Sequence, residues 1–389
     1  MEAIRSFSKH FYIRLATALS LILVACSPAE KATLIIQGNI TQDTTWTSEA
    51  VYILDGLVQV ANGATLTIQP GTLVKAKPGE SPNASMLIIA KGAKINAVGT
   101  AQNPIVFTSA DDNIMNVQES SQSVLNENNK GLWGGIIILG AAPVSIENET
   151  KSTFYVGLDP NDPNSFYGGD QPDDNSGKLK YVSIRFGGTY MGTGSESNGL
   201  TLCGVGSQTE IDQIEVYANQ DDGIEFFGGT VNASNLLVFS SGDDGIDIDE
   251  GYTGSLRNIM VVLGEQSDSG MEISGGKGAS AGEFNISDVK LTVHTPTEDQ
   301  QIIRVDAQSK GKIKGLLASN FLDVSKIELA SKNVVIDQLQ ITKNDKTTNS
   351  MEEIVGDTAD DSQVIFSDSI EMENQKMFDW TLAQQKISH

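Results

Sequence analysis

Short apolar runs separated by polar turns fill most of the chain. The runs hold three or four residues, are rich in Ile, Val and Leu, and are separated by turns with Gly, Asn or Asp; clear cases are residues 65–68, 86–89, 105–107 and 136–139. No long stretch in the middle of the chain carries apolar residues at helical spacing. Runs this short and this closely spaced leave no room for helices between the strands. The pattern predicts an all-β protein.

A repeat of 22 to 25 residues organises these runs. The sequence DDGIEF at residues 221–226 returns as DDGIDI at 243–248, with looser copies at 198–202 and 268–273. One such unit cannot bury its own apolar face, so successive units must stack. A strand, a polar turn, a glycine and a second strand per unit fit one coil of a right-handed parallel β-helix. We therefore expect inward ladders of Ile, Leu, Val and Phe.

Breaks in this pattern suggest the domain boundaries. We expect a signal segment at residues 1–25, a tether at 26–33, the β-helix at 34–345 and an acidic C-terminal cap or tail at 346–389. Polar insertions near 110–130 and 150–178 are expected to protrude on one side of the β-helix. Phe378 and Trp380 in the tail are expected to close the last coil, because an open end of a β-helix is an exposed strand edge.

The first residues look like an export signal. Basic residues precede an apolar run at 15–25 that is too short to span a bilayer. The run ends in Leu23-Val24-Ala25-Cys26, which resembles a bacterial lipobox. That resemblance implies acylation of Cys26 and a membrane anchor in the cell envelope. Because Ser27 rather than Asp follows, it favours the outer membrane, with the periplasmic or the surface face left open.

Composition excludes several classes of function. The 50 acidic residues outnumber the 26 basic ones, giving a net charge of −24, which disfavours any nucleic-acid partner. Three His and two Cys are too few for a zinc centre, a His-based triad or a disulfide scaffold. No residue is assigned a catalytic role.

Acidic residues of the repeat are the strongest candidate site. Stacked coils lie about 4.8 Å apart, so equivalent carboxylates repel unless a cation intervenes. Ca²⁺ takes six to eight oxygen ligands, which such a ladder and its turn carbonyls can supply. The alternative is that the residues only form solvated turns. The candidate calcium ligands are Asp221, Asp222, Glu225, Asp243, Asp244, Asp247 and Asp249.

Several motifs together resemble one bacterial family. They include Gly63-Ala64-Thr65-Leu66-Thr67-Ile68, Gly131-Leu132-Trp133-Gly134-Gly135 and Asn219-Gln220-Asp221-Asp222-Gly223. The chain is similar to lipid-anchored right-handed parallel β-helix lipoproteins of pectate-lyase-like fold over about residues 34–385. The resemblance implies fold and location, and it supplies no catalytic residue. The Asp-Asp-Gly-Ile-Asp turn also resembles calcium-binding turns of some β-helix polysaccharide lyases.

Three functions remain open from the sequence. The first is a non-catalytic module that binds a polysaccharide or an envelope protein; the second is a polysaccharide lyase; the third is a purely structural envelope lipoprotein. A lyase needs a basic residue to remove a proton next to a uronate carboxylate, and Arg185 is a candidate. Aromatic side chains of the second insertion can stack on sugars. The expected ligand-facing residues are Arg185, Tyr155, Phe166 and Tyr167.

Overall fold

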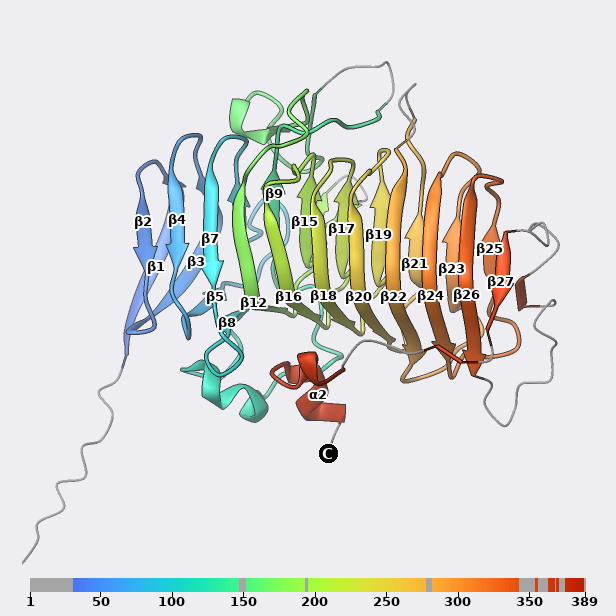
Figure 1. Ribbon diagram of the computed structural model, residues 1–389. Helices are drawn as coiled ribbons and strands as arrows, with labels where there is room; N and C mark the ends of the chain where they lie inside the picture. The colour runs from blue at the N-terminus through green and yellow to red at the C-terminus, as the bar shows by residue number, and fades with distance from the viewer. Residues whose placement is uncertain are drawn as a thin grey trace, which may run out of the picture. The chain divides into compact units, whose positions relative to one another are not determined.

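Parallel strands stacked in coils make up almost all of the regular structure. A computed structural model describes residues 31–146, 152–192, 195–277, 282–342, 354–355, 363–367, 369–370 and 375–387. Residues 31–389 belong to one compact unit, and Figure 1 shows its strands side by side along the stack. The chain forms a right-handed parallel β-helix, as the repeat predicted. The predicted signal segment and Cys26 lie outside the described residues.

Three ladders of parallel strands wrap around one apolar core. The first coils are built from β1 (Ala32–Ile40), β2 (Thr44–Trp46), β3 (Ala50–Val60), β4 (Thr65–Ile68), β5 (Leu73–Ala76), β7 (Lys94–Val98) and β8 (Ile105–Ser109). Long strands that contribute to two ladders follow: β12 (Gly177–Arg185), β16 (Glu210–Tyr217), β18 (Asn232–Phe239), β20 (Ser255–Leu263), β22 (Phe284–Val293), β24 (Gly311–Ser319) and β26 (Val334–Thr342). The last short strand, β27 (Val364–Phe366), pairs with β26, so the predicted tail continues the ladder.

Short strands form the ladder that matters for the site, which we call the third ladder. It runs from the end of β3 through β6 (Met86–Ile89), β9 (Ile136–Leu139), β15 (Leu200–Cys203), β17 (Ile224–Phe227), β19 (Ile246–Asp249), β21 (Ser269–Ile273), β23 (Gln301–Val305) and β25 (Ile327–Leu329). Alternate residues of each strand point into the core, where Ile224, Phe226, Ile246 and Ile248 are buried. Burying one such side chain contributes about 1.5–3 kcal/mol.

A single left-handed residue bends each long strand between two ladders. Tyr181, Gln213 and Asn235 have φ of 51°, 56° and 56°, and they occupy equivalent positions in successive coils. Asn and Asp tolerate this conformation better than most residues, and the ladder continues with Asn258 and Asp288. The Asn258 amide donates to Asn235 Oδ1 at 2.6 Å. This ladder of bends keeps the coils in register, and therefore keeps the acidic turns aligned.

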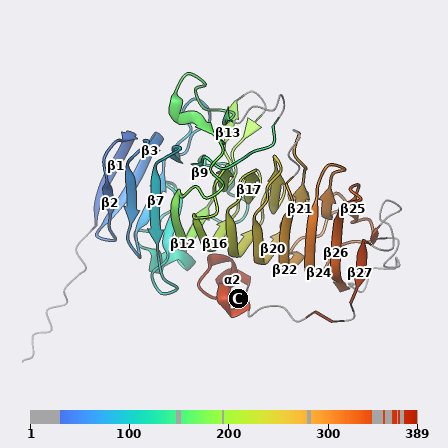
Figure 2. The same ribbon diagram turned by 45° about the horizontal axis from the view of Figure 1, so that its top comes forward.

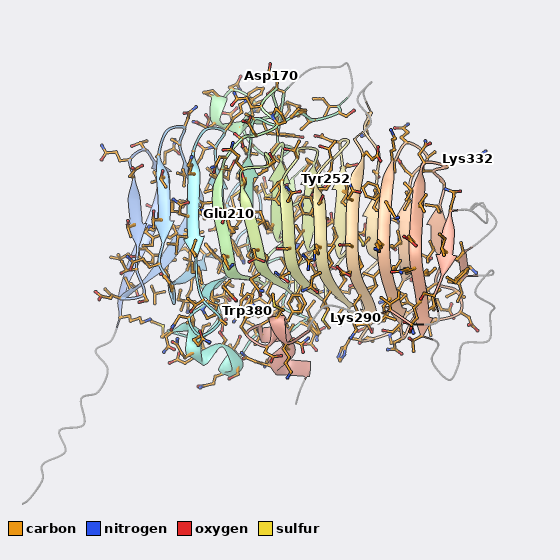
Figure 3. All side chains as sticks on the ribbon, viewed as in Figure 1. Asp170, Glu210, Tyr252, Lys290, Lys332 and Trp380 are labelled. Carbon is orange, nitrogen blue, oxygen red and sulfur yellow. The ribbon has the colours of Figure 1, made fainter. Side chains whose placement is uncertain are left out.

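The two insertions lie at opposite ends of the strands, so the prediction that they share one side is wrong. One carries the 3₁₀ helix η1 (Val117–Gln122), near α2 (Leu382–Ile387). The other carries β10 (Thr153–Phe154), η3 (Pro163–Ser165) and β11 (Phe166–Tyr167). Figure 3 shows Asp170, from the second insertion, and Trp380, near the first, at opposite ends of the strands.

The C-terminal residues do not close the last coil, contrary to the prediction. η4 (Gln375–Phe378) and α2 lie against the middle coils instead (Figures 1 and 2). Trp380 Nε1 donates to Gln213 Oε1 at 2.9 Å, and Phe378 packs in a cluster with Tyr217 and Phe239. The outward faces of these strands are apolar and need a cover, which the C-terminal aromatic residues supply. We call residues 375–387 the C-terminal strap. No helix among the described residues is long and apolar enough to cross a membrane.

Candidate functional site

The outward side chains of the third ladder change from apolar to acidic along the stack of coils. Parallel pairing aligns Ile88, Ile137, Thr201, Glu225, Asp247, Glu272 and Arg304 in successive strands. The first two are apolar and buried. The next members are polar or acidic, and the row then reaches a guanidinium. The candidate site lies where the apolar part of this row gives way to the acidic part.

Three carboxylates meet in the middle of this row, and we call them the inner carboxylates. Oxygen atoms of Asp222, Glu225 and Asp247 all lie within 4.8 Å of one another. Asn198, which is 2% exposed, donates through Nδ2 to Glu225 Oε2. Asn198 Oδ1 and Asp247 Oδ1 are buried and have no hydrogen-bond partner. The group therefore offers acceptor oxygens without the donors to satisfy them.

Two of the acidic residues also have a clear role in the fold. Asp222 Oδ1 accepts the backbone N–H of Asp244 at 2.9 Å, and Asp244 Oδ1 accepts the N–H of Ser269 at 2.9 Å. Each carboxylate thus holds the turn of the next coil. Charge-assisted bonds of this kind are stronger than neutral ones. One oxygen of each of these two carboxylates therefore has a structural role in the turns. That role does not account for the second oxygen.

Arg304 compensates the acidic residues in one part of the row. Its guanidinium pairs with Asp268 at 2.7 Å, with Glu272, and with Asp244 at 3.8 Å. Within the described part of the chain, no Lys or Arg forms an ion pair with any inner carboxylate. Among the described residues, the row thus holds a cation beside Glu272 and Glu328 and none paired with the inner carboxylates.

Burial without compensating charge raises the pKa of the acidic side chains. Burial is the main cause of the raised pKa of Asp222, Glu225 and Asp247, and neighbouring carboxylates raise it further. Burial, then Asp243 and Glu196, raise the pKa of Asp221 to about 7. The pKa of Glu250 rises to about 7, mainly through burial. Burial and neighbouring carboxylates thus favour the protonated form of these groups, and a bound cation favours the charged form.

A cleft of about 1120 Å³ opens over β17. Its walls combine acidic side chains with aromatic rings, and one basic side chain, Lys277, is among the described residues that line it. The lining includes Phe154, Tyr155, Tyr167, Tyr190, Phe227, Glu196, Asp221, Asp222, Glu225, Asp243, Glu250 and Lys277. Figure 2 shows β13 (Tyr190–Gly192) and the second insertion above β17.

Aromatic residues predicted to face a ligand lie at this cleft, with one exception. Tyr155 and Tyr167 are buried and pack against Phe227, with ring centroids 5.9 and 6.3 Å apart. The Tyr167 hydroxyl donates to Glu250 Oε1 at 3.0 Å. Phe166 is not among the lining residues; its ring lies edge-on to Phe154 at 6.2 Å. The insertion therefore covers the apolar part of the row and forms one wall of the cleft.

Arg185 does not face a ligand, and that prediction is wrong. Its side chain is 2% exposed and lies on the second half of β12, outside the third ladder. Its Nε donates to Ser183 Oγ at 2.7 Å, and Nη2 lies 3.8 Å from Glu215 Oε2. The strap covers this ion pair, since Ala383 N donates to Glu215 Oε1 at 2.7 Å. Sequence alone hides this because the strap comes from a distant part of the chain.

Several cleft residues were missed by the sequence reasoning. Glu196 and Tyr190 come from a short hairpin of β13 and β14 (Ser195–Glu196) that the repeat does not predict. Asn198 and Glu250 could have been predicted from the sequence, because Asn198 begins the repeat copy at 198–202 and Glu250 closely follows the copy at 243–248. Asp249 was predicted to point outward with Asp247; burial raises its pKa to about 6, although it is not among the lining residues.

Comparison with protein families then identifies the architecture. A profile described as a pectate-lyase-like β-helix domain matches residues 38–384. The chain belongs to this family. The match to the pectate-lyase-like β-helix domain extends through η4 and the first residues of α2. No curated protein sequence matches the chain.

Two solved structures are similar to this pectate-lyase-like domain at low sequence identity. Pectin methylesterase from Aspergillus niger is 12% identical, with 91% of this chain and 96% of that one covered and a TM-score of 0.35. The tailspike protein of Acinetobacter baumannii phage AM24 is 9% identical, with 79% and 48% covered and a TM-score of 0.25. At these identities the similarity concerns the fold alone.

Proposed function

We propose that this protein is a lipid-anchored envelope module that holds a calcium ion in its inner carboxylates and binds a glycan in the cleft above them. The observation that supports this proposal most directly is the cluster of Asp222, Glu225 and Asp247, which has no basic partner among the described residues and of which Asp222 and Glu225 line an aromatic-walled cleft. The membrane anchor at Cys26 rests on the lipobox of the sequence.

The donor set suits a hard divalent cation. Two oxygens bound to one Ca²⁺ at about 2.3–2.6 Å lie at most about 5 Å apart, which is compatible with the 4.8 Å limit within the inner carboxylates. Asp247 Oδ1 is a buried acceptor without a hydrogen-bond partner among the described residues. Bound calcium compensates the negative charges that burial otherwise disfavours. Asp222, Glu225 and Asp247 are the side chains we assign to it.

The wall of the cleft suits a sugar. Aromatic rings pack on the apolar faces of sugar rings, and carboxylates accept hydrogen bonds from hydroxyl groups. The exposed fractions of Tyr190 and Phe154 are 41% and 37%, so both rings offer surface at the mouth of the cleft. A glycan lying there contacts rings and carboxylates at once.

Binding without chemistry is the function that the cleft supports better than lyase activity. A lyase needs a base beside the sugar and a positive charge beside the uronate carboxylate. Arg185 is buried elsewhere, and Lys277 lies beside Asp249 and Glu250, which compete for its charge. Six lining carboxylates also repel a polyuronate. We therefore place the lyase second.

Thermal unfolding of the chain from residue 27 onward, in EDTA and then in millimolar CaCl₂, tests the calcium site. Calcium that binds only the folded chain adds RT ln(1 + [L]/Kd), about 2.7 kcal/mol at a hundredfold excess over Kd. We expect Tm to rise with calcium. The double variant Glu225→Gln/Asp247→Asn should lose this rise and should unfold at higher temperature than the unsubstituted chain in EDTA, because a repulsion is removed.

Glu210→Gln is the matched control, because it also removes one carboxylate, exposed and paired with Lys178 far from the inner carboxylates. It should keep the full calcium response. An unsubstituted chain whose Tm ignores calcium would contradict the calcium site and favour a purely structural role for the acidic turns. A response that survives in the double variant would place the ion elsewhere.

A further inference from the structure

A second group of carboxylates lies near the mouth of the cleft, and we call Glu196, Asp221 and Asp243 the outer carboxylates. Glu196 comes from β14, and the other two come from the turns before β17 and β19. Oxygens of Asp221 and Asp243 lie within 4.8 Å of each other. Glu196 is close enough to act on Asp221 electrostatically. Three separate coils or hairpins therefore direct negative charge to one place.

The outer carboxylates have little opposing charge. Lys277, the basic residue among the described lining side chains, acts on Asp249 and Glu250 instead. Arg304 influences Asp243, but it is already paired with Asp268 and Glu272. The mouth of the cleft is thus a region of negative potential with low-dielectric walls, which concentrates cations.

A buried acceptor beside the cleft, on Asn198, points to a ligand that donates hydrogen bonds. Asn198 is 2% exposed and lies against Glu225, a lining residue, yet its Oδ1 has no partner. A buried acceptor left without a donor costs about 1–3 kcal/mol of desolvation. This observation is independent of the outer carboxylates, and it shows one buried acceptor beside the cleft whose donor is not supplied by the described residues.

Aromatic rings beside these charges narrow the class of ligand. Tyr190 and Phe154 expose their rings at the same cleft. A ring face attracts a cation electrostatically, and the attraction grows when the cation is partly desolvated. Rings and carboxylates together suit a protonated amine, whose N–H groups donate to the carboxylates while its carbon skeleton packs on the rings.

We infer that the glycan of this cleft carries free amino groups, and that the outer carboxylates bind them as ammonium ions. This inference rests on the proposed glycan-binding function and names its ligand class. It separates the protein from a polyuronate binder, because uronate carboxylates meet repulsion at the mouth. Glu225 and Asp247 remain available to calcium, whereas Asp222 lies within 4.8 Å of Asp221 and Asp243 and borders both groups.

Isothermal titration calorimetry with three matched oligosaccharides tests the inference. The probes are a β-1,4-linked glucosamine tetramer, its fully N-acetylated counterpart and a galacturonate tetramer, each titrated into the chain from residue 27 onward at about pH 7 with calcium present. The first two share one skeleton and differ in charge. We expect the amine-bearing tetramer to bind at least tenfold more tightly than the acetylated one, with an affinity that falls as salt rises. We expect no binding of the galacturonate.

The double variant Glu196→Gln/Asp243→Asn should weaken the amine-bearing tetramer at least tenfold and leave the acetylated one unchanged. The control Glu210→Gln should change neither. Equal binding of the two glucosamine tetramers would overturn the amine inference and leave the glycan function standing. Preferential binding of galacturonate would overturn the inference in favour of a calcium-bridged uronate. Absence of binding by all three would overturn the inference and count against glycan binding itself.

Discussion

Individual carboxylates of this protein can be neutralised either by a proton or by a bound cation. Asp221 has a pKa of about 7 in the folded chain, against 3.8 for an unperturbed group, because burial and the neighbouring Asp243 and Glu196 disfavour its charge. Asp222, Glu225 and Asp247 are raised in the same way. Their ionisation is therefore unfavourable in the folded state and unopposed in the unfolded one.

The sign of the pH dependence follows. Between about pH 4 and pH 7 the folded chain holds more protons on these groups than the unfolded chain, so the free energy of unfolding falls as pH rises. In EDTA we expect a lower Tm at about pH 7.5 than at about pH 5, measured by circular dichroism. Calcium should reduce this difference in Tm between the two pH values. The double variant Asp221→Asn/Glu225→Gln should show a smaller difference even without calcium. A Tm that rises over this window in EDTA would show that other groups dominate.

At the scale of strands, register turns a sequence repeat into a row of charges. Parallel pairing places Asp247 beside Glu225 and Glu272, and places Arg304 beside Glu272. One cation thus sits between Glu272 and Glu328 of this row, and its pairs with Asp268 and Glu272 are half-buried. The strand ladder, rather than any local motif, decides which carboxylates are compensated.

Arg304→Gln should therefore destabilise the chain in EDTA, because Asp268, Glu272 and Asp244 lose their shared partner. We expect a loss of about 1–3 kcal/mol, less than for a fully buried pair because the guanidinium is partly exposed. Urea unfolding measures it. Calcium should recover more stability in this variant than in the unsubstituted chain, since Asp243, Asp244 and Asp268 then form a second uncompensated group. Equal stability of the variant and the unsubstituted chain would mean that Arg304 contributes nothing net.

The coil and the acidic row could be predicted from the sequence, because both depend on the local spacing of residues. The 22-residue step from Asp221 to Asp243 sets which side chains stack, and Gly223 and Gly245 mark equivalent turns. The cleft could not be predicted from the sequence, because the wall opposite the acidic row comes from hairpins that lack the repeat periodicity. The sequence-based prediction misplaced Arg185 and Trp380 for a related reason: their partners lie across a surface that only the completed coil creates.

At the scale of the whole chain, one cysteine outside the described residues carries the proposed location. The lipobox predicts that Cys26 is acylated. Two or more acyl chains give stable membrane anchoring. Cys26→Ala should move the protein from the membrane fraction to the soluble fraction, as fractionation and immunoblotting measure. Cys203→Ala is the matched control, since that thiol is buried in β15 and should not affect partitioning. Membrane association of the Cys26→Ala variant would contradict the anchor.

The strap imposes an order on biosynthesis. Most coils can form as the chain emerges, since each strand pairs with one a few tens of residues earlier, but Glu215 and Gln213 meet their last partners 168 and 167 residues further on. Until residues 375–387 arrive, the flank with Tyr217 and Phe239 stays open, and exposed apolar surface of this kind promotes aggregation during folding. A chain that lacks residues 375–387 therefore keeps its paired coils and leaves this apolar flank uncovered.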